Sequence, residues 1–400
     1  MVFFREIPPT AGLPMLWRDW LPTNRNLKHD AAILFKLPPL LLESSGTAAF
    51  IIALETLKRM PQNIERTEVI IPAFNCPLVL LAIAQCGLIP RLCDTKLNHF
   101  DFDLIALEKL LSKKTLAIVP THIGGQLADV DAVMPLAHSY GAFVIEDGAQ
   151  AFGSSAGKSA DIVFFSLAVG KGLTLFEGGL LTAREEKMRR ALQQTHDQFI
   201  QRKPSLEAKR ILELLGYTLA YRPFMLQWAY GTPRRNNLKK GDIENAVGDV
   251  FSFPIPLHKV STLREKRGAR ALQRYPVFLE KIKTQAKRRI DHLHTIPSIH
   301  VIKGITKETN IWPFLILLMP DRKSRDQALE TLWPSPYGVT RLFVHALANY
   351  NYLKPFLDNQ DNTPNAINFA DRLLTISNSL WMNDDDFDCI IKILKQSLPQ

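Results

Sequence analysis

The sequence contains few cysteines, and their spacing fits neither a metal site nor a disulfide framework. Only four occur in 400 residues, at positions 76, 86, 93 and 389, and no two of them form a Cys-x-x-Cys pair. No histidine accompanies them at the spacing of a zinc site. We therefore expect reduced, mostly buried thiols and no metal ion.

Long hydrophobic runs are also missing. The longest apolar runs, such as Leu78 to Ala84 and Phe314 to Met319, are far shorter than the ~20 residues that a membrane-spanning helix needs. The N-terminus lacks the basic segment, apolar core and small-residue cleavage site of a signal peptide. These absences predict a cytoplasmic protein without a membrane partner.

A third absence concerns nucleic-acid recognition. The net charge of +10 could serve an anionic partner, but the basic residues are spread over several segments and no RNA- or DNA-binding motif contains them. The sequence also has no internal repeat and no low-complexity tract. A basic surface or an anionic small substrate accounts for the charge equally well, so we expect no nucleic-acid partner.

The composition is that of a globular protein with room for two domains, since 46% of the residues are hydrophobic and 22% are charged. Residues 1–30 are expected to form an irregular, proline-rich arm. A large domain should span 31–255, with a helical and basic insert at about 190–250, and a smaller α+β domain should span 256–400. The insert is either a solvated surface segment or a flap that covers the substrate or contacts a second subunit.

Short apolar runs alternate with amphipathic segments between residues 69 and 147. The expected strands are 69–72, 89–93, 116–120 and 142–146, and the expected helices are 77–85, 104–111 and 130–139. This alternation predicts an α/β fold with a mainly parallel sheet between helices. Polar residues that follow the strands should then gather at one edge of the sheet.

Further along the chain the pattern is less regular. We expect charged helices at 184–203 and 206–219, and an irregular, basic segment at 221–248. Beyond it, the sequence predicts strands at 312–319 and 338–345 and helices at 325–332 and 386–398.

Three polar residues stand at or just beyond strand ends. Asp147 follows the apolar run 142–145, Ser166 follows the run 162–165, and Lys171 stands in a glycine-bounded turn five residues later. A lysine that forms a Schiff base, a carboxylate that keeps a pyridine nitrogen protonated and a hydroxyl that holds a phosphate form the set that pyridoxal phosphate requires. Taken alone, such a lysine is more often a solvated loop residue.

Two other stretches carry weaker signals. Ser45, Gly46 and Thr47 precede an apolar helix, where they would form a phosphate cradle or simply an N-cap. For His122, which follows a strand, we expect a hydrogen-bonded scaffold role rather than acid–base chemistry. Glu146 must point away from its neighbour Asp147, because successive residues of a strand face opposite sides.

In order and approximate spacing these motifs resemble those of the DegT/StrS sugar aminotransferases, which are pyridoxal phosphate enzymes of the aspartate aminotransferase fold (fold type I) and generally homodimers. The resemblance is specific from about residue 40 to 185 and weaker in the C-terminal segments 338–345, 370–374 and 385–388. The motifs are Ser45-Gly-Thr-Ala-Ala49, Pro72-Ala-Phe-Asn-Cys-Pro77, Thr121-His-Ile-Gly-Gly-Gln126, Glu146-Asp-Gly-Ala-Gln150, Ser166-x4-Lys171 and Glu177-Gly-Gly179.

The resemblance implies a role for each matched residue. Lys171 would be the Schiff-base lysine and proton carrier, and Asp147 would pair with the pyridinium nitrogen. An amino acid, glutamate in most of the family, would leave its amine on pyridoxal 5′-phosphate, and a nucleotide-linked keto-sugar would take it up in a ping-pong reaction. The other cofactor-binding residues implied by the match are Gly46, Thr47 and Ser166 at the phosphate, Gln150 near the ring hydroxyl and Cys76 against the ring.

The sequence departs from the family in three places. Cys76 stands where an aromatic residue commonly stacks on the cofactor ring, with Phe74 two residues before it. The family's Gly-x-Asn-x-Arg segment has no clear match, since Phe251-Ser-Phe-Pro-Ile-Pro256 falls there, and the insert is longer than in the family. Lys171 itself argues against the dehydratase branch, which has histidine at this position.

Two alternative readings stay open at the level of sequence. A pyridoxal phosphate enzyme of another reaction type would catalyse an elimination or a sulfur transfer that uses Cys76. A non-catalytic member of the fold would act as a regulatory or scaffold protein.

Overall fold

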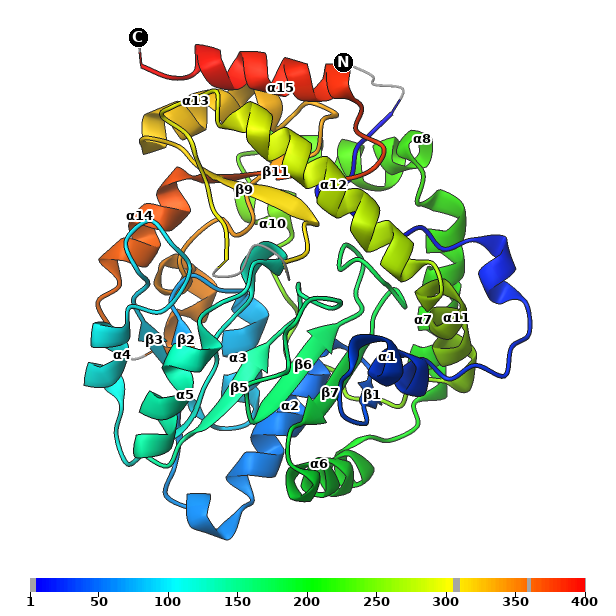
Figure 1. The fold of residues 1–400 in the computed structure, drawn as a ribbon, viewed down its shortest axis with the longest axis vertical. Coiled ribbons are helices and arrows are strands. Elements are labelled where there is room, and N and C mark those ends of the chain that lie inside the picture. The colour runs from blue at the N-terminus through cyan, green and yellow to red at the C-terminus, as the bar shows by residue number, and fades with distance from the viewer. Residues whose placement is uncertain (1–4, 305–309, 358–360, 400) are drawn as a thin grey trace.

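Two β-sheets organise the chain, and the computed structural model describes residues 5–304, 310–357 and 361–399. The larger sheet has the order β1-β7-β6-β5-β4-β2-β3, and the smaller has the order β10-β11-β9-β8. In Figure 1 the larger sheet lies in the lower half of the molecule and the smaller in the upper half. The strands are β1 (Leu41–Glu43), β2 (Glu68–Pro72), β3 (Ile89–Cys93), β4 (Thr115–Ile118), β5 (Phe143–Asp147), β6 (Ile162–Ser166), β7 (Gly179–Ala183), β8 (His300–Val301), β9 (Phe314–Leu318), β10 (Val339–Thr340) and β11 (Leu373–Ser377).

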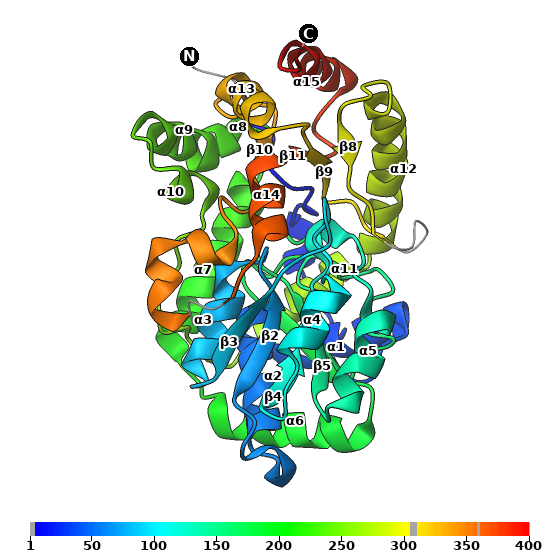
Figure 2. The ribbon, with the colours of Figure 1, turned by 90° about the vertical axis from the view of Figure 1, so that its left-hand side faces the viewer.

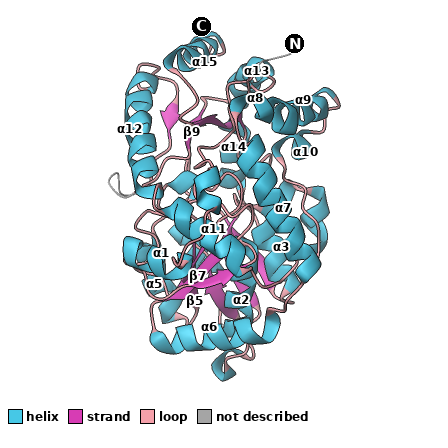
Figure 3. Cartoon of the chain, turned by 90° about the vertical axis from the view of Figure 1, so that its right-hand side faces the viewer, coloured by secondary structure: helices cyan, strands magenta, loops and turns pink. Residues whose placement is uncertain are grey.

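Helices enclose the strands of the larger sheet (Figure 3). The helices before β7 and the one directly after it are α1 (Leu27–Phe35), α2 (Gly46–Lys58), α3 (Pro77–Gln85), α4 (Leu104–Leu110), α5 (Val130–Ser139) and α6 (Glu186–Phe199). The insert and the bridge to the smaller sheet contain α7 (Pro204–Ala220), α8 (Pro223–Leu226), α9 (Thr232–Lys239), α10 (Ile243–Val247), α11 (Thr262–Leu272) and α12 (Tyr275–Leu293). The last helices are α13 (Arg322–Leu332), α14 (Pro364–Arg372) and α15 (Asp384–Gln396).

The larger sheet is mainly parallel, as the sequence predicts. Strands β2 to β6 run parallel to their neighbours, whereas β7 is antiparallel to β6 and β1 is antiparallel to β7. Helices α3 and α5 and strand β3 have the predicted bounds, and the other expected elements between 69 and 147 are shifted by one or two residues. The predicted fold class is therefore confirmed.

Neighbouring residues of each strand supply two different cores, which explains why these runs are apolar throughout. Ile71 and Ile145 belong to the core beneath α2 and α3, whereas Ile70 and Val144 belong to the core beneath α4 and α5. The sheet is buried on both faces. Its carboxyl edge is left as the place where polar side chains can meet.

Two of the sequence predictions were wrong. The segment 221–248 is not irregular: it forms α8, a π-helical turn at Gln227–Gly231, α9 and α10. Its prolines stand in the first turns of α8 and α9, where a missing N–H costs nothing. The strand expected at 338–345 is reduced to β10, because the N–H of Val344 donates to the Asp249 carboxylate at 2.7 Å instead of to a neighbouring strand.

The N-terminal arm is anchored to the insert by a buried carboxylate. Glu6 is fully buried and accepts from Arg234 at 2.7 Å and from Arg235 at 2.8 Å. Arg234 is itself buried and also donates to the carbonyl of Ser335 at 2.8 Å. Helices α8, α9 and α10 consequently stand beside α13 in the upper half of the molecule (Figure 2).

The division of the chain at residue 256 stays a prediction. Helix α11 packs against α1, so residues 262–272 contact the half of the molecule that contains the larger sheet. Among the described helices, none combines the length and the hydrophobicity needed to cross a membrane.

The anchor predicts a large loss of stability when Glu6 is removed. Glu6→Ala leaves Arg234 buried without its carboxylate, so we expect the free energy of unfolding in urea to fall by about 3–5 kcal/mol. Arg288→Ala is the control, because the side chains of its ion pair with Asp384 are 61% and 64% exposed. It should cost less than about 1 kcal/mol, and equal losses for the two variants would contradict the anchoring role.

Candidate active site

Asp147 ends β5 at the carboxyl edge of the larger sheet and is 3% exposed. Its Oδ1 accepts the N–H of Ala149 at 2.9 Å, and its backbone is tied to Pro120 and His122 of the neighbouring strand end. Burial raises the pKa of Asp147 to about 6, against the opposing effects of the Ala149 N–H, Lys171 and His122. The sheet therefore presents a desolvated carboxylate.

Glu146 points to the other side, as the strand alternation predicts. Its Oε1 lies 2.6 Å from Nε2 of His122 and its Oε2 accepts the N–H of Gly157 at 2.9 Å. Because Nδ1 of His122 accepts the N–H of Ala128 at 2.9 Å, the neutral ring carries its proton on Nε2 and donates it to Glu146. Both ring nitrogens are occupied, which fits the scaffold role expected of His122.

Lys171 lies on the loop between β6 and β7, flanked by two glycines in left-handed conformations. Gly170 has φ +84° and Gly172 has φ +79°, which only glycine adopts without strain. Burial lowers the pKa of Lys171, while Cys76 and Asp147 act in the opposite direction. The Lys171 amine makes no hydrogen bond or ion pair with any residue that the structure describes. The uncharged form of an amine attacks a carbonyl carbon, and a lowered pKa favours that form.

A small anion would fit at the start of α2. Ser45 caps the helix by accepting the N–H of Ala48 at 3.0 Å. Across the described chain no protein group accepts from the N–H groups of Gly46 and Thr47, at the positive end of the helix dipole. A Cβ on Gly46 would approach the Cβ of Ser166 to 2.8 Å, so glycine allows the serine at the end of β6 to lie against this helix start.

Cys76 and Gln150 lie near the lysine from two other strand ends. Burial raises the pKa of Cys76 to about 12, although Lys171 lowers it, so the thiol stays protonated. The Cys76 N–H donates to the side chain of Asn75 at 2.7 Å. The Oε1 of Gln150 accepts the N–H of Gly124 at 2.6 Å, and Gln150 lines the same cavity as Lys171.

The sequence did not point to the residues that surround Cys76 on its other side. Asp249 and Tyr352 lie near enough to influence its thiol electrostatically, and Asp249 is held by the hydroxyl of Tyr350 at 2.5 Å. Phe74, the nearest aromatic residue in sequence, is fully buried against Phe343 and Phe369. No motif marked Asp249 or Tyr352, since both lie outside the segment with specific motifs.

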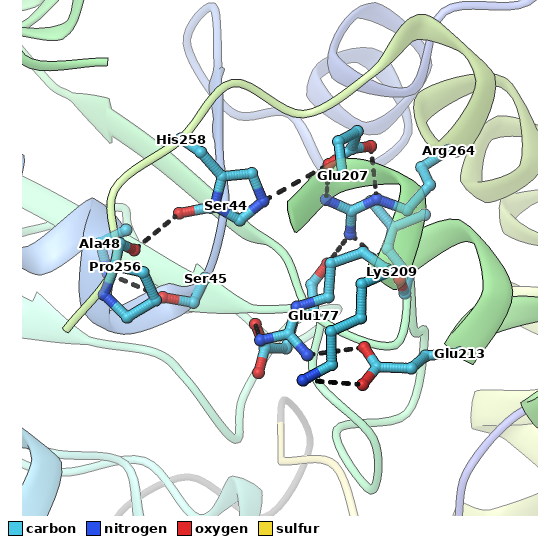
Figure 4. Close-up of polar contacts among 12 residues, drawn as sticks. Ser44, Ser45, Ala48, Glu177, Glu207, Lys209, Glu213, Pro256, His258 and Arg264 are labelled. Atoms are coloured by element: carbon cyan, nitrogen blue, oxygen red, sulfur yellow. Dashed lines mark hydrogen bonds and ion pairs between the residues drawn. The ribbon is translucent and has the colours of Figure 1, made fainter. Parts of the chain in front are cut away.

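Contacts with helix α7 of the insert hold the loop that carries Lys171, residues 167–178, which we call the lysine loop (Figure 4). Glu207 receives two 2.7 Å hydrogen bonds from the fully buried Arg264, whose Nη1 donates to the carbonyls of Leu175 and Glu177. Arg210 of the same helix pairs with the Glu177 carboxylate at 2.6 Å. Burial raises the pKa of Glu207, but hydrogen bonds led by Arg264 outweigh this and hold the pKa well below its usual value.

The residue between the two fastened carbonyls is strained. Phe176 has φ +69°, a conformation that costs a non-glycine residue of order 1–3 kcal/mol. Its N–H donates to the Thr174 hydroxyl at 2.9 Å and its carbonyl accepts the N–H of Val169 at 3.0 Å. The hydrogen bonds from Arg264 to the carbonyls of Leu175 and Glu177 thus stabilise the loop conformation in which Lys171 is held.

A cavity of about 580 Å³ opens beside Lys171. Its wall combines the N-terminal arm (Pro8 to Ala11), the insert (Tyr217 of α7 and Tyr221, which follows that helix) and α12 (Phe278). The cavity has the size and the mostly apolar lining of a small-molecule site. Of the residues predicted to bind the cofactor, Lys171 and Gln150 line this cavity, so the insert forms part of a cavity wall beside the lysine.

These residues fit pyridoxal phosphate. The free N–H groups of α2 and the Ser166 hydroxyl suit a phosphate, the buried Asp147 suits a protonated ring nitrogen, and the Lys171 amine suits an aldehyde. The structure brings Lys171, Asp147 and Cys76 within electrostatic reach of one another and places Gly46 against Ser166. Their individual roles remain predictions.

The raised pKa of Asp147 predicts that Asp147→Asn stabilises the cofactor-free protein. An ordinary aspartate titrates near 3.9, and a folded pKa of about 6 means that ionisation costs the folded state about 3 kcal/mol above pH 7. Most of this cost is lost by about pH 4, and it vanishes at lower pH as the unfolded state also becomes protonated. Urea unfolding between pH 4 and 8 should therefore show a gain that grows as the pH rises.

Asp321→Asn is the control for this experiment. Asp321 caps α13 from a partly exposed position, and hydrogen bonding to the Ser324 N–H lowers its pKa, so its replacement should bring no gain. If Asp147→Asn were equally stabilising at pH 4, the titration of the carboxylate would not be the cause.

The Glu207–Arg264 pair predicts a loosened lysine loop when the carboxylate is removed. Glu207→Ala leaves Arg264 buried without a counter-ion, which should cost about 3 kcal/mol of stability. Hydrogen exchange in residues 167–178 should accelerate. Glu186→Ala, which removes an exposed ion pair with Arg190 on α6, should leave that exchange unchanged. Equal exchange in both variants would mean that Glu207 does not fasten the loop.

Comparisons with known proteins agree with this geometry. The model of the DegT/DnrJ/EryC1/StrS aminotransferase family matches residues 28–222. SpsC of Bacillus subtilis, a spore coat polysaccharide biosynthesis protein, is 26% identical over 96% of this chain and 92% of its own. Two relatives match only part of their length. GDP-perosamine synthase of Caulobacter vibrioides is 31% identical over 36% of this chain and 39% of its own. A Streptomyces kanamyceticus protein named for L-glutamine:3-amino-2,3-dideoxy-scyllo-inosose aminotransfer is 32% identical over 36% of this chain and 35% of its own.

The fold is shared with solved structures. Spr1654 of Streptococcus pneumoniae, a protein named for sugar aminotransfer, superposes with a TM-score of 0.73 in its PMP form, at 19% identity, over 98% of each chain. The same protein is also known in a PLP form. The predicted cofactor and the predicted enzyme class, an aminotransferase, are thus confirmed at the level of family and fold. Residues 28–222, which carry the six site motifs, are of the DegT/DnrJ/EryC1/StrS aminotransferase family, as those motifs predicted.

Proposed function

We propose that this protein is a pyridoxal phosphate-dependent aminotransferase that moves an amino group from glutamate to a keto-sugar or a related carbonyl compound. The observation that carries the proposal is the unengaged Lys171 amine, with its pKa lowered, beside the buried Asp147. Glutamate would become 2-oxoglutarate and the acceptor's carbonyl would become an amine, so the exchange needs no other oxidant or reductant.

Each residue has a distinct part in this proposal. The cofactor, when bound, supplies an aldehyde and an electron-withdrawing ring. Asp147 would hold the ring nitrogen in its protonated form, and Lys171 would move the proton at the substrate's α-carbon. Gly46, Thr47 and Ser166 would hold the phosphate. Gln150 and Cys76 would lie against the ring.

The proposal also covers the acceptor substrate, the oligomeric state and the cellular location. The relatives' names include both a nucleotide-linked sugar and a free carbocycle, so a nucleotide-linked keto-sugar is one form of the acceptor. A homodimer is supported by exposed apolar side chains on the insert, among them Leu219, Phe224 and Trp228. We place the protein in the cytoplasm, which the absence of a membrane-spanning helix among the described residues permits.

The chemistry of Cys76 speaks against sulfur transfer as the reaction. A sulfur carrier needs a thiolate on a mobile segment, whereas burial raises the pKa of Cys76 to about 12 and the residue is the N-cap of α3. The non-catalytic reading has no comparable support, because Lys171 and Asp147 are both in place.

The proposal predicts that Lys171 carries the cofactor. After incubation with pyridoxal phosphate and reduction with borohydride, mass spectrometry should find the added mass on the peptide containing Lys171. Lys171→Ala should lose this adduct and convert bound cofactor to its amino form with glutamate at least about 100-fold more slowly. Lys158→Ala, an exposed control, should behave as the wild type. An adduct on another lysine, or a wild-type spectrum that ignores glutamate, would contradict the proposal.

A further inference from the structure

A second buried carboxylate, Asp249, lies near Cys76 and has no part in the proposed chemistry. It follows α10 at the end of the insert and is 3% exposed. Its Oδ2 accepts the N–H of Val344 at 2.7 Å and the hydroxyl of Tyr350 at 2.5 Å. Within the described part of the chain no cationic side chain forms an ion pair with it. Hydrogen bonds from neutral donors therefore offset the cost of burying this charge.

Two tyrosines complete the contact. Tyr350 is fully buried, and the hydroxyl that donates to Asp249 also accepts the N–H of Val344 at 2.9 Å. Tyr352 donates to the backbone carbonyl of Asp249 at 2.5 Å. Asp249 is thus bonded to three residues of the segment 343–352, which we call the tyrosine segment.

The tyrosine segment lies against the loop that carries Cys76, residues 73–76. The N–H of Leu347 donates to the carbonyl of Ala73 at 2.8 Å. The 3-10 helix Asn351–Phe356 at the end of the segment contacts α3, and Cys76 is the N-cap of α3. The C-terminal part of the chain therefore packs on the Cys76 loop, and Asp249 joins the insert to that packing.

The thiol of Cys76 lies near both the tyrosine segment and the charged groups of the candidate site. Burial is the main cause of its raised pKa, which Lys171 lowers and which Asp249 and Asp147 raise. Charges shift a pKa in this way only at short range. A thiol also covers less of a ring than an aromatic side chain does. Its contact with a cofactor ring would therefore depend strongly on where the loop is held.

We infer that Asp249 is a positioning residue of the cofactor site, which holds the tyrosine segment against the Cys76 loop and so fixes the wall that Cys76 presents to the cofactor ring. The inference rests on the proposed function, because that proposal places Cys76 against the ring. Asp249 acts through Tyr350 and Tyr352 and touches neither cofactor nor substrate.

Two variants break this contact in different ways. Asp249→Ala removes the carboxylate, whereas Tyr350→Phe removes the hydroxyl and keeps the charge of Asp249. Asp386→Ala is the control, because Asp386 is buried to a similar degree, at 4% exposed, and pairs with Arg5. It lies in the first turn of α15, at the upper end of the molecule in Figure 1, whereas α3 lies in the lower half.

The measurement is the rate at which iodoacetamide alkylates Cys76, followed by mass spectrometry of the peptide that contains it. Cys76 is partly exposed, so the reagent can report on its cover. In cofactor-free protein, Asp249→Ala and Tyr350→Phe should each raise the rate about 10-fold or more, because each removes a hydrogen bond that involves a buried carboxylate. Asp386→Ala should leave the rate unchanged.

Pyridoxal phosphate supplies a second readout, which a merely structural role would not move. It should protect Cys76 from alkylation in the wild type, because the ring would cover the thiol. The concentration that gives half-maximal protection should rise about 10-fold or more in Asp249→Ala and in Tyr350→Phe. In Asp386→Ala it should stay at the wild-type value.

Several results would overturn the inference. Acceleration in Asp249→Ala but not in Tyr350→Phe would mean that the lost charge alone acts on the thiol. Equal acceleration in Asp386→Ala would mean that any loss of a buried carboxylate loosens the loop. Unchanged rates in both Asp249→Ala and Tyr350→Phe would remove the positioning role, and a wild type without protection would remove Cys76 from the ring.

Conversion of the bound cofactor by glutamate tests the proposed function separately. If the wild type ignored glutamate while the alkylation and protection results held, aminotransfer from glutamate would fail and the positioning role of Asp249 in the cofactor site would stand. If glutamate converted the cofactor and the variants alkylated like the wild type, only the inference would fail.

Discussion

The arrangement of the site depends on one buried guanidinium group. Arg264 of α11 is fully buried, and it joins the carboxylate of Glu207 on the insert to the carbonyls of Leu175 and Glu177 on the lysine loop. A buried arginine is tolerated only when its donors are satisfied. Three separate parts of the chain must therefore meet at this point before Lys171 can be presented. The left-handed conformation of Phe176, which lies between the two carbonyls that Arg264 binds, is the backbone strain that accompanies these contacts.

The part of the site that we propose binds the cofactor was the most predictable part of the molecule. Strand ends of a parallel sheet gather at one edge whatever the details of packing, so Asp147, Ser166 and Lys171 could be placed from apolar runs and spacing alone. Gly46 belongs to the same group, because a glycine at a helix start has a local reason to be there. Strict alternation in β5 likewise assigned Glu146 and Asp147 to opposite sides.

The remaining features could not be predicted, because they depend on contacts between distant segments. Arg264 and Glu207 are 57 residues apart, and neither stands in a recognisable motif. Asp249 reaches the site environment through Tyr350, 101 residues away. The segment 221–248 was misjudged for a different reason: its prolines and charges are typical of loops, yet prolines in a first helical turn are compatible with helices. Local composition could not distinguish these two cases.

The two halves of the site come from different kinds of structure. Strand ends and the first turn of α2 supply the groups suited to the cofactor, whereas the arm, α7 and α12 supply the cavity wall. A substitution on the cavity side of α7 changes that wall without touching a strand end. Such a division would allow the cavity wall to be changed while the groups suited to the cofactor stay in place. Exchanging α7 between relatives would be a rational route to altered specificity, provided that the carboxylate at Glu207 is retained to hold Arg264.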